Sequence, residues 1–175
     1  MIISDPPKPY FAEGELYTYL GSIDAYGKNI TGHLRIKRIS TTSVRMVFTN
    51  ESGFQLLALE LSDGEMNTHF AFEKLDKKIV LNTIERDLQL IFYESLCDQF
   101  FREPENTVII ECANKKHNYR FQLSGNQNVE KIFVESGDKT DMTVNFAAPE
   151  AVPDTIRIDH RDIKLNYLFY RIDEE

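Results

Sequence analysis

The dominant pattern along the chain is an alternation of apolar and polar residues with a period of two. In residues 32–39, Leu34 and Ile36 alternate with Arg35 and Lys37. Such alternation is typical of a strand with one face in a core and the other in solvent. Segments of this kind, or apolar runs of strand length, recur before residue 76: 16–23, 44–49, 54–61 and 66–73. Short turns join them, among them a tight hairpin turn with Asp63-Gly64 at its centre, so the pattern predicts an antiparallel meander.

The period changes after Asp76. Apolar residues then follow one another at helical spacing: Val80, Leu81, Ile84, Leu88, Ile91 and Phe92. This stripe predicts a helix of about five turns from residue 77 to about residue 95, with Asp76 as its N-cap. The segment 54–61 is apolar on both faces. We expect the helix to pack its apolar stripe against that strand.

Alternation returns after the helix and continues to the end of the chain. Six further segments carry it: 107–112, 118–123, 129–135, 142–146, 155–159 and 163–172. The predicted fold is therefore mainly β with one long helix. About eleven antiparallel strands in one open sheet would curl, which gives a strongly curved half-barrel wrapped around the helix. A two-sheet sandwich capped by the helix is the alternative.

Neither an internal repeat nor a long linker divides the chain of 175 residues, which has the usual size of one domain. We expect a single domain over residues 14–175, preceded by an extended, proline-stiffened leader over residues 1–13. The leader has neither a basic segment nor a long apolar run, so it is not typical of a signal peptide. Either the protein is cytoplasmic, or an export signal lies outside this sequence.

The charge balance narrows the class of partner. The chain has 28 Asp and Glu residues against 20 Lys and Arg residues, a formal charge of −8. Nucleic-acid binding needs a positive surface, so we expect no nucleic-acid partner. Basic side chains do gather on the first strands: Arg35, Lys37, Arg38 and Arg45. They predict either a solvated sheet face that discourages edge pairing or a surface for lipid headgroups.

Residues that could carry chemistry are sparse. Four histidines lie far apart in the sequence, without the spacing of a metal site: His33, His69, His117 and His160. We expect no metal and no cofactor. Residues 159–162, Asp-His-Arg-Asp, form the densest polar cluster. We interpret them as a charged turn; the alternative is a His160 base oriented by a carboxylate. We therefore expect the protein not to be an enzyme.

Cys97 and Cys112 are too few for a scaffold held together by disulfides. Each lies in or beside an apolar stretch, which favours two buried thiols that pack as small apolar side chains. In an oxidising compartment the pair would instead form one disulfide.

The order of elements resembles the bacterial lipoprotein carrier superfamily, the periplasmic chaperone LolA and the outer-membrane receptor LolB. Three segments carry the resemblance. The first is the front meander, 32–37 into 44–49, with a loop at 50–53 that leads to Phe54. The second is the helix placed after the fifth strand. The third is the ending, 152–160 and then 163–167. The resemblance covers roughly residues 14–172.

The resemblance implies an unclosed β-barrel with a helical lid and an apolar cavity that accepts acyl chains. In the receptor branch, the loop after the third strand carries an exposed apolar residue used in membrane transfer, and Phe54 is the matching residue here. It also implies a location in the periplasm or at the inner leaflet of the outer membrane, if a signal was removed, and contact with a membrane surface.

These expectations together predict a non-enzymatic envelope lipoprotein-type domain that binds an acyl chain, a lipoprotein or another apolar ligand between the curved sheet and the helix. The candidate lining residues come from the strands and the helix: Leu34, Ile36, Met46, Phe48, Phe70, Phe72, Ile84, Leu88 and Ile91. If the helix packs tightly, the same residues form a filled core. The alternative function is then an envelope protein–protein interaction module without a ligand.

Overall fold

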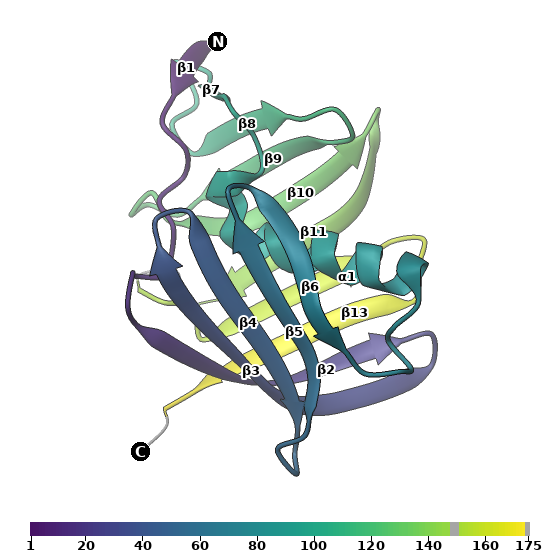
Figure 1. Ribbon diagram of the computed structural model, residues 1–175. Coiled ribbons are helices and arrows are strands. Elements are labelled where there is room, and N and C mark those ends of the chain that lie inside the picture. Colours follow the sequence, from purple (N-terminus) through teal and green to yellow (C-terminus); the bar gives the residue numbers. More distant parts are fainter. Residues whose placement is uncertain (148–150, 174–175) are drawn as a thin grey trace.

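The computed structural model describes residues 1–147 and 151–173. All of its named strands belong to one antiparallel sheet of 13 strands, which curls around the helix without closing (Figure 1). The spatial order is β1-β7-β8-β9-β10-β11-β12-β13-β2-β3-β4-β5-β6. This confirms the predicted class, mainly β with one helix in a curved half-barrel. A two-sheet sandwich is excluded because the strands form a single sheet.

The front meander consists of five strands: β2 (Leu16–Ala25), β3 (Lys28–Ser40), β4 (Ser43–Asn50), β5 (Gln55–Ser62) and β6 (Glu65–Ala71). The predicted hairpin turn at Asp63-Gly64 connects β5 to β6, and both residues have positive φ angles. Asp-Gly supplies these angles at little steric cost. Gly32 serves a different purpose, since a Cβ atom there would lie 1.8 Å from the Thr49 carbonyl oxygen on β4.

The back half of the sheet holds six strands in sequence: β8 (Ile109–Ala113), β9 (Asn118–Leu123), β10 (Val129–Ser136), β11 (Lys139–Ala147), β12 (Thr155–His160) and β13 (Leu165–Ile172). β13 pairs with β2, which joins the two halves. Two short strands, β1 (Ile2–Ser4) and β7 (Phe100–Arg102), extend the back edge. With these two, the sheet has more strands than the eleven that were predicted. The sequence did not reveal them because a strand of three residues is too short to show an alternating pattern.

The helical segment divides into two parts. α1 covers Lys78–Gln89, and a 3₁₀ helix, η1, covers Leu90–Ser95 with non-helical angles at Phe92. Leu90, Ile91, Phe92 and Tyr93 are all buried. The predicted helix is therefore present as one continuous helical segment. Four consecutive buried residues cover every face of a helix, so its C-terminal part is enclosed on all sides, and this part departs from a regular α-helix by its 3₁₀ geometry and the kink at Phe92.

The predicted N-cap is wrong. Lys77 occupies the cap position and makes no side-chain cap bond. Asp76 lies in the preceding turn, where its backbone N–H donates to the Phe72 carbonyl oxygen at 3.0 Å. The chain therefore enters α1 through a turn instead of through a side-chain cap.

Candidate functional site

The space between the helical segment and strands β3 and β4 is filled. Seven of the nine proposed lining residues are at most 1% exposed and belong to one core cluster: Leu34, Ile36, Met46, Phe48, Ile84, Leu88 and Ile91. Side chains this inaccessible border neither solvent nor an internal space that could admit water. The structure thus brings these residues together as packing partners.

Phe70 and Phe72 lie elsewhere. The pairing of β5 with β6 shifts between Leu59, opposite Thr68, and Ala58, opposite Phe70. One extra residue on β6 is a β-bulge, and it changes which side chains face the core. Phe70 and Phe72 are consequently 43% and 42% exposed. The two residues were expected to line an internal cavity. Because of this bulge they lie on the surface instead.

Phe54 stands out from the loop that precedes β5. Its side chain is 71% exposed. The loop is closed by the Asn50 backbone N–H, which donates to the Phe54 carbonyl oxygen at 2.9 Å, while the Phe54 N–H donates to Asn50 Oδ1 at 2.9 Å. An ordered loop therefore presents an apolar ring to the outside of the molecule.

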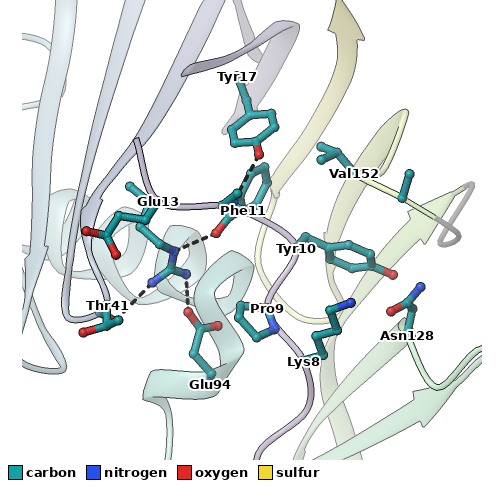
Figure 2. Close-up of a pocket in the computed structure, with 13 residues that line it drawn as sticks. Lys8, Pro9, Tyr10, Phe11, Glu13, Tyr17, Thr41, Glu94, Asn128 and Val152 are labelled. Carbon is teal, nitrogen blue, oxygen red and sulfur yellow. Dashed lines mark hydrogen bonds and ion pairs between the residues drawn. The ribbon is translucent and has the colours of Figure 1, made fainter. Parts of the chain in front are cut away.

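A cavity of about 710 Å³ is lined in part by residues 8–13, a segment that we call the strap. Its lining is mainly apolar, and we call it the strap pocket; it is formed by the strap, Tyr17, Arg38, Thr41, Glu94, Asn128, Ala151 and Val152. Figure 2 shows Tyr10, Asn128 and Val152 on one side of the strap and Thr41 and Glu94 on the other. The predicted leader thus forms the wall of a cavity.

Hydrogen bonds from the domain hold the strap in place. Tyr93 on η1 donates its hydroxyl to the Lys8 carbonyl oxygen at 2.6 Å, and the Ala12 N–H donates to the Tyr17 hydroxyl at 3.1 Å. Tyr10 donates its hydroxyl to the Val129 carbonyl oxygen on β10. Phe11 is buried against Tyr17 and against other rings of the core. The strap is therefore a packed part of the domain.

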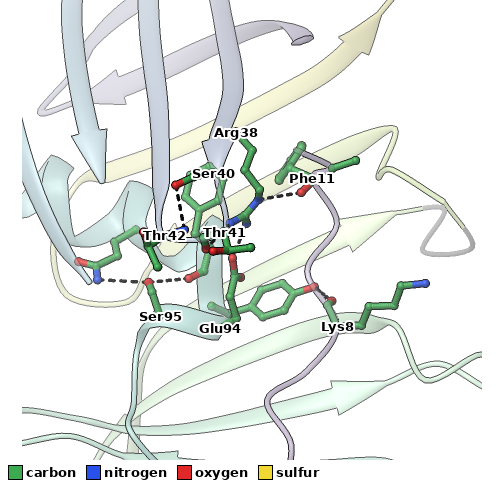
Figure 3. A network of polar contacts seen from close by, with 12 residues as sticks. Lys8, Phe11, Arg38, Ser40, Thr41, Thr42, Glu94 and Ser95 are labelled. Atoms are coloured by element: carbon green, nitrogen blue, oxygen red, sulfur yellow. Dashed lines mark hydrogen bonds and ion pairs between the residues drawn. The ribbon is translucent and has the colours of Figure 1, made fainter. Parts of the chain in front are cut away.

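Arg38 links the strap to its surroundings (Figure 3). This buried guanidinium donates from Nε to the Phe11 carbonyl oxygen at 2.8 Å and from Nη1 to the Thr41 carbonyl oxygen at 3.2 Å. Its Nη2 pairs with Glu94 Oε1 on η1. One of the four residues of the predicted basic stripe therefore points into the molecule and borders the strap pocket.

Burial raises the pKa of Tyr10 and of Tyr93 above the usual value for tyrosine. Both phenols stay protonated near neutral pH, so both keep the proton that they donate to a carbonyl oxygen. The strap is consequently held by neutral donors that do not titrate in the physiological range.

His160 belongs to a buried polar cluster and not to an exposed charged turn. Its side chain is 4% exposed, and its Nε2 lies 2.6 Å from Oδ2 of Asp87, a fully buried carboxylate on α1. The Tyr167 hydroxyl on β13 donates to the same oxygen at 2.9 Å. A carboxylate does orient His160, but it comes from the helix and not from residues 159–162. The cluster fastens α1 to β12 and β13.

The cysteines form a disulfide, Cys97–Cys112, with 6.2 Å between their Cα atoms. This corrects the expectation of two free thiols. Cys97 follows η1 and Cys112 lies on β8, so the bond ties the end of the helical segment to the back half of the sheet. The spacing of the two cysteines in the sequence does not predict that they are close, because their proximity depends on the curl of the sheet.

Within residues 1–147 and 151–173, no group of three or more His, Cys, Asp and Glu side chains is arranged to hold a metal ion. No helix in the same part of the chain combines the length and apolar character needed to span a bilayer.

Comparisons with known proteins show the fold. No family model matches the chain, and no curated protein matches it. Among solved structures, a DUF1329 family protein from Desulfovibrio piger is similar, with a TM-score of 0.54 and 9% sequence identity. The alignment covers 90% of this chain and 83% of that one. At this identity the likeness extends to architecture alone.

Proposed function

We propose that the protein is a non-enzymatic lipoprotein-type domain of the cell envelope that binds an acyl chain or a similar apolar ligand in the strap pocket. The observation that supports this most directly is a mainly apolar cavity of about 710 Å³ beside a core that is otherwise filled. Ligand sites are typically concave, largely apolar and roughly 300–1,000 Å³ in volume. The proposed binding site therefore lies at the strap and not between the sheet and the helix, where the sequence had predicted it.

The lining suits an acyl chain with an acidic end. Tyr10, Tyr17 and Val152 offer apolar surface, and burial of each methylene group contributes about 0.8 kcal/mol. Lys8 lies on the strap, and its ammonium group makes no ion pair with any residue that the structure describes. It can meet the carboxylate of a fatty acid at the edge of the pocket.

An envelope location agrees with the disulfide. Disulfides persist in oxidising compartments such as the bacterial periplasm and are rare in the cytosol. The resemblance to the LolA and LolB carriers, whose architecture is also an unclosed barrel around a helix, points in the same direction. We infer a periplasmic or outer-membrane setting from these two observations.

The proposal is tested with cis-parinaric acid, a fatty acid whose fluorescence rises in an apolar site. The wild type should bind it, and Val152→Trp, which fills the strap pocket, should lower the affinity about tenfold or more through overpacking. Val108→Trp is the matched control because Val108 is exposed and lies outside the pocket. Equal uptake by the two variants would contradict the assignment of the pocket.

A second candidate is an interaction module that uses Phe54. The filled core and the exposed ring on an ordered loop favour it. Aromatic residues that stand out from a surface often act as anchors for partners or membranes. Phe54→Ser should change the free energy of unfolding by less than about 0.5 kcal/mol and should reduce binding to phospholipid vesicles or to a partner. Unchanged binding would remove Phe54 from consideration.

A further inference from the structure

A second cavity differs from the strap pocket in chemistry. It has a volume of about 940 Å³ and lies between α1, the β5–β6 turn and the β8–β9 turn. We call it the polar cleft. Its basic side chains are Arg86, Lys115 and Lys116, its acidic side chains are Glu65, Glu85 and Asp98, and His117 and Tyr119 also line it. Arg86 and His117 also line an adjoining pocket of about 190 Å³, together with His160 and Asp141. The two residues therefore stand where both spaces meet.

The turn that carries Lys116 and His117 is held rigidly. Asn114 Oδ1 accepts hydrogen bonds from the backbone N–H groups of Lys116 at 2.9 Å and His117 at 3.0 Å. Asn114 Nδ2 donates to the Tyr119 hydroxyl at 3.0 Å. The disulfide of Cys112 ties the adjacent strand β8 to the end of the helical segment. These contacts fix the wall of the cleft before any ligand arrives.

The carboxylate of Asp87 positions the side chain of Arg86. Its Nη2 lies 3.3 Å from Oδ1 of Asp87, the carboxylate that also binds His160 and Tyr167 through its other oxygen. One guanidinium donor is used in this way, and a guanidinium has five. The side chain is still partly exposed to the cleft. Arg86 can thus present its remaining donors to a ligand in a fixed orientation.

His117 has unused hydrogen-bonding capacity. Within the described residues, neither nitrogen of its ring makes a hydrogen bond, and Nδ1 is buried. Burial lowers the pKa of His117, and the nearby charges of Arg86 and Lys116 lower it further. Asp141 on β11 acts in the opposite direction, but its carboxylate already accepts a hydrogen bond from Ser136. Two positive groups, Arg86 and Lys116, therefore act on this ring from either side of the space it borders.

We propose that the corner formed by Arg86, Lys116 and His117 binds a small anionic group, a phosphate or a carboxylate. A bidentate contact from Arg86 suits either group. The anion would offset the repulsion between the cationic side chains and would accept a hydrogen bond from the protonated His117 ring. This site is separate from the strap pocket, so it stands or falls independently of the proposed function.

Binding should be linked to protons. An anion favours the charged form of His117 and so raises its pKa in the complex above that in the free protein. The complex then takes up a proton, and affinity rises as the pH falls through the bound-state pKa, levelling off below the free-state pKa. The other titratable and charged groups near the ring are Arg86 from α1, Lys116 from the same turn, His160 from β12, Asp141 from β11 and Asp162 from the β12–β13 turn.

The test is an NMR titration of the four histidine C2 protons in the absence and presence of inorganic phosphate. We expect phosphate to raise the titration midpoint of His117 and to leave that of His69 unchanged, since His69 is exposed on β6 and pairs with Glu60. Arg86→Gln should lower phosphate affinity about tenfold or more. Arg157→Gln is the matched control, because that guanidinium is exposed and pairs with Asp159.

Arg86→Gln also removes the ion pair with Asp87 and could affect the buried cluster, so a second variant is needed. Lys116→Gln removes a cleft charge without contact to the buried cluster and should weaken phosphate binding several-fold. Vesicles with phosphatidic acid, compared with phosphatidylcholine alone, distinguish a lipid headgroup from a free solute; a His117 response to either source supports the site. An unchanged His117 midpoint with both sources, or equal responses in Lys116→Gln and wild type, would overturn it.

Discussion

The strap pocket and the polar cleft are neighbours with opposite character. Consecutive residues of η1 line them, Glu94 the first and Ser95 the second. The strap, which lines the strap pocket, contains the aromatic residues Tyr10 and Phe11, whereas the β8–β9 turn, which lines the polar cleft, is rich in lysine and asparagine. The helical segment η1 is thus common to both cavities. The strap makes the first cavity apolar, and the β8–β9 turn makes the second polar.

The means of holding the two walls also differ. The strap is fixed by hydrogen bonds and by the ring of Phe11, whereas the turn of the cleft is fixed next to a covalent bond, Cys97–Cys112. The base of the cleft is the buried Asp87 cluster. We therefore expect changes near the cleft to affect global stability more than changes at the strap.

The largest effect should follow from Asp87→Ala. It leaves His160 and Tyr167 buried without their partner, and breaking such a cluster typically costs about 3–5 kcal/mol. Urea denaturation measures the change in the free energy of unfolding. Asp162→Ala is the control, since this carboxylate is 73% exposed and should change stability by less than about 0.5 kcal/mol. A loss below about 1 kcal/mol for Asp87→Ala would show that the cluster is not the anchor of α1.

Removing the disulfide should have the next largest effect. Replacing both Cys97 and Cys112 by Ser opens a loop with a sequence separation of 15, which corresponds to about 3 kcal/mol. Because the bond lies beside the polar cleft, the response of His117 to phosphate should weaken while uptake of cis-parinaric acid persists. Loss of both responses in a variant that remains folded would mean that the two cavities are not independent.

Tyr93→Phe should have a small and local effect. It removes the hydroxyl that donates to the Lys8 carbonyl oxygen, and a hydrogen bond of this kind contributes about 1 kcal/mol. Hydrogen exchange should become faster in the strap and stay unchanged in the β8–β9 turn. Tyr170→Phe, at an exposed position on β13, serves as the control. Equal protection of the strap in both variants would show that Tyr93 does not hold it.

Local signals in the sequence predicted most of the architecture. Alternation located the strands of both halves, the Asp63-Gly64 turn followed from its composition, and the helical stripe marked the residues that became core. These features depend on neighbours within a few positions, where backbone geometry and side-chain period act directly. The fold class could therefore be predicted from the sequence.

The cavities depend on contacts between distant segments. The bulge on β6 changes which way Phe70 faces, and no feature of residues 66–73 marks its position. Cys97 meets Cys112, Arg38 meets Glu94, and His160 meets Asp87 only after the sheet has curled. The strap gave a partial signal, since Tyr10 and Phe11 are large rings in a segment that was expected to be an extended leader outside the domain. An aromatic pair in such a place indicates docking onto the domain.

We have proposed that an apolar ligand occupies the strap pocket. The most direct test is native mass spectrometry of the protein purified from its own organism, followed by organic extraction, for the wild type and for Val152→Trp. We expect a co-purifying mass that extracts as a fatty acid or another lipid and that is lost in the variant. An apo mass alone for the wild type, together with no uptake of cis-parinaric acid, would contradict the account and leave the interaction module as the better explanation.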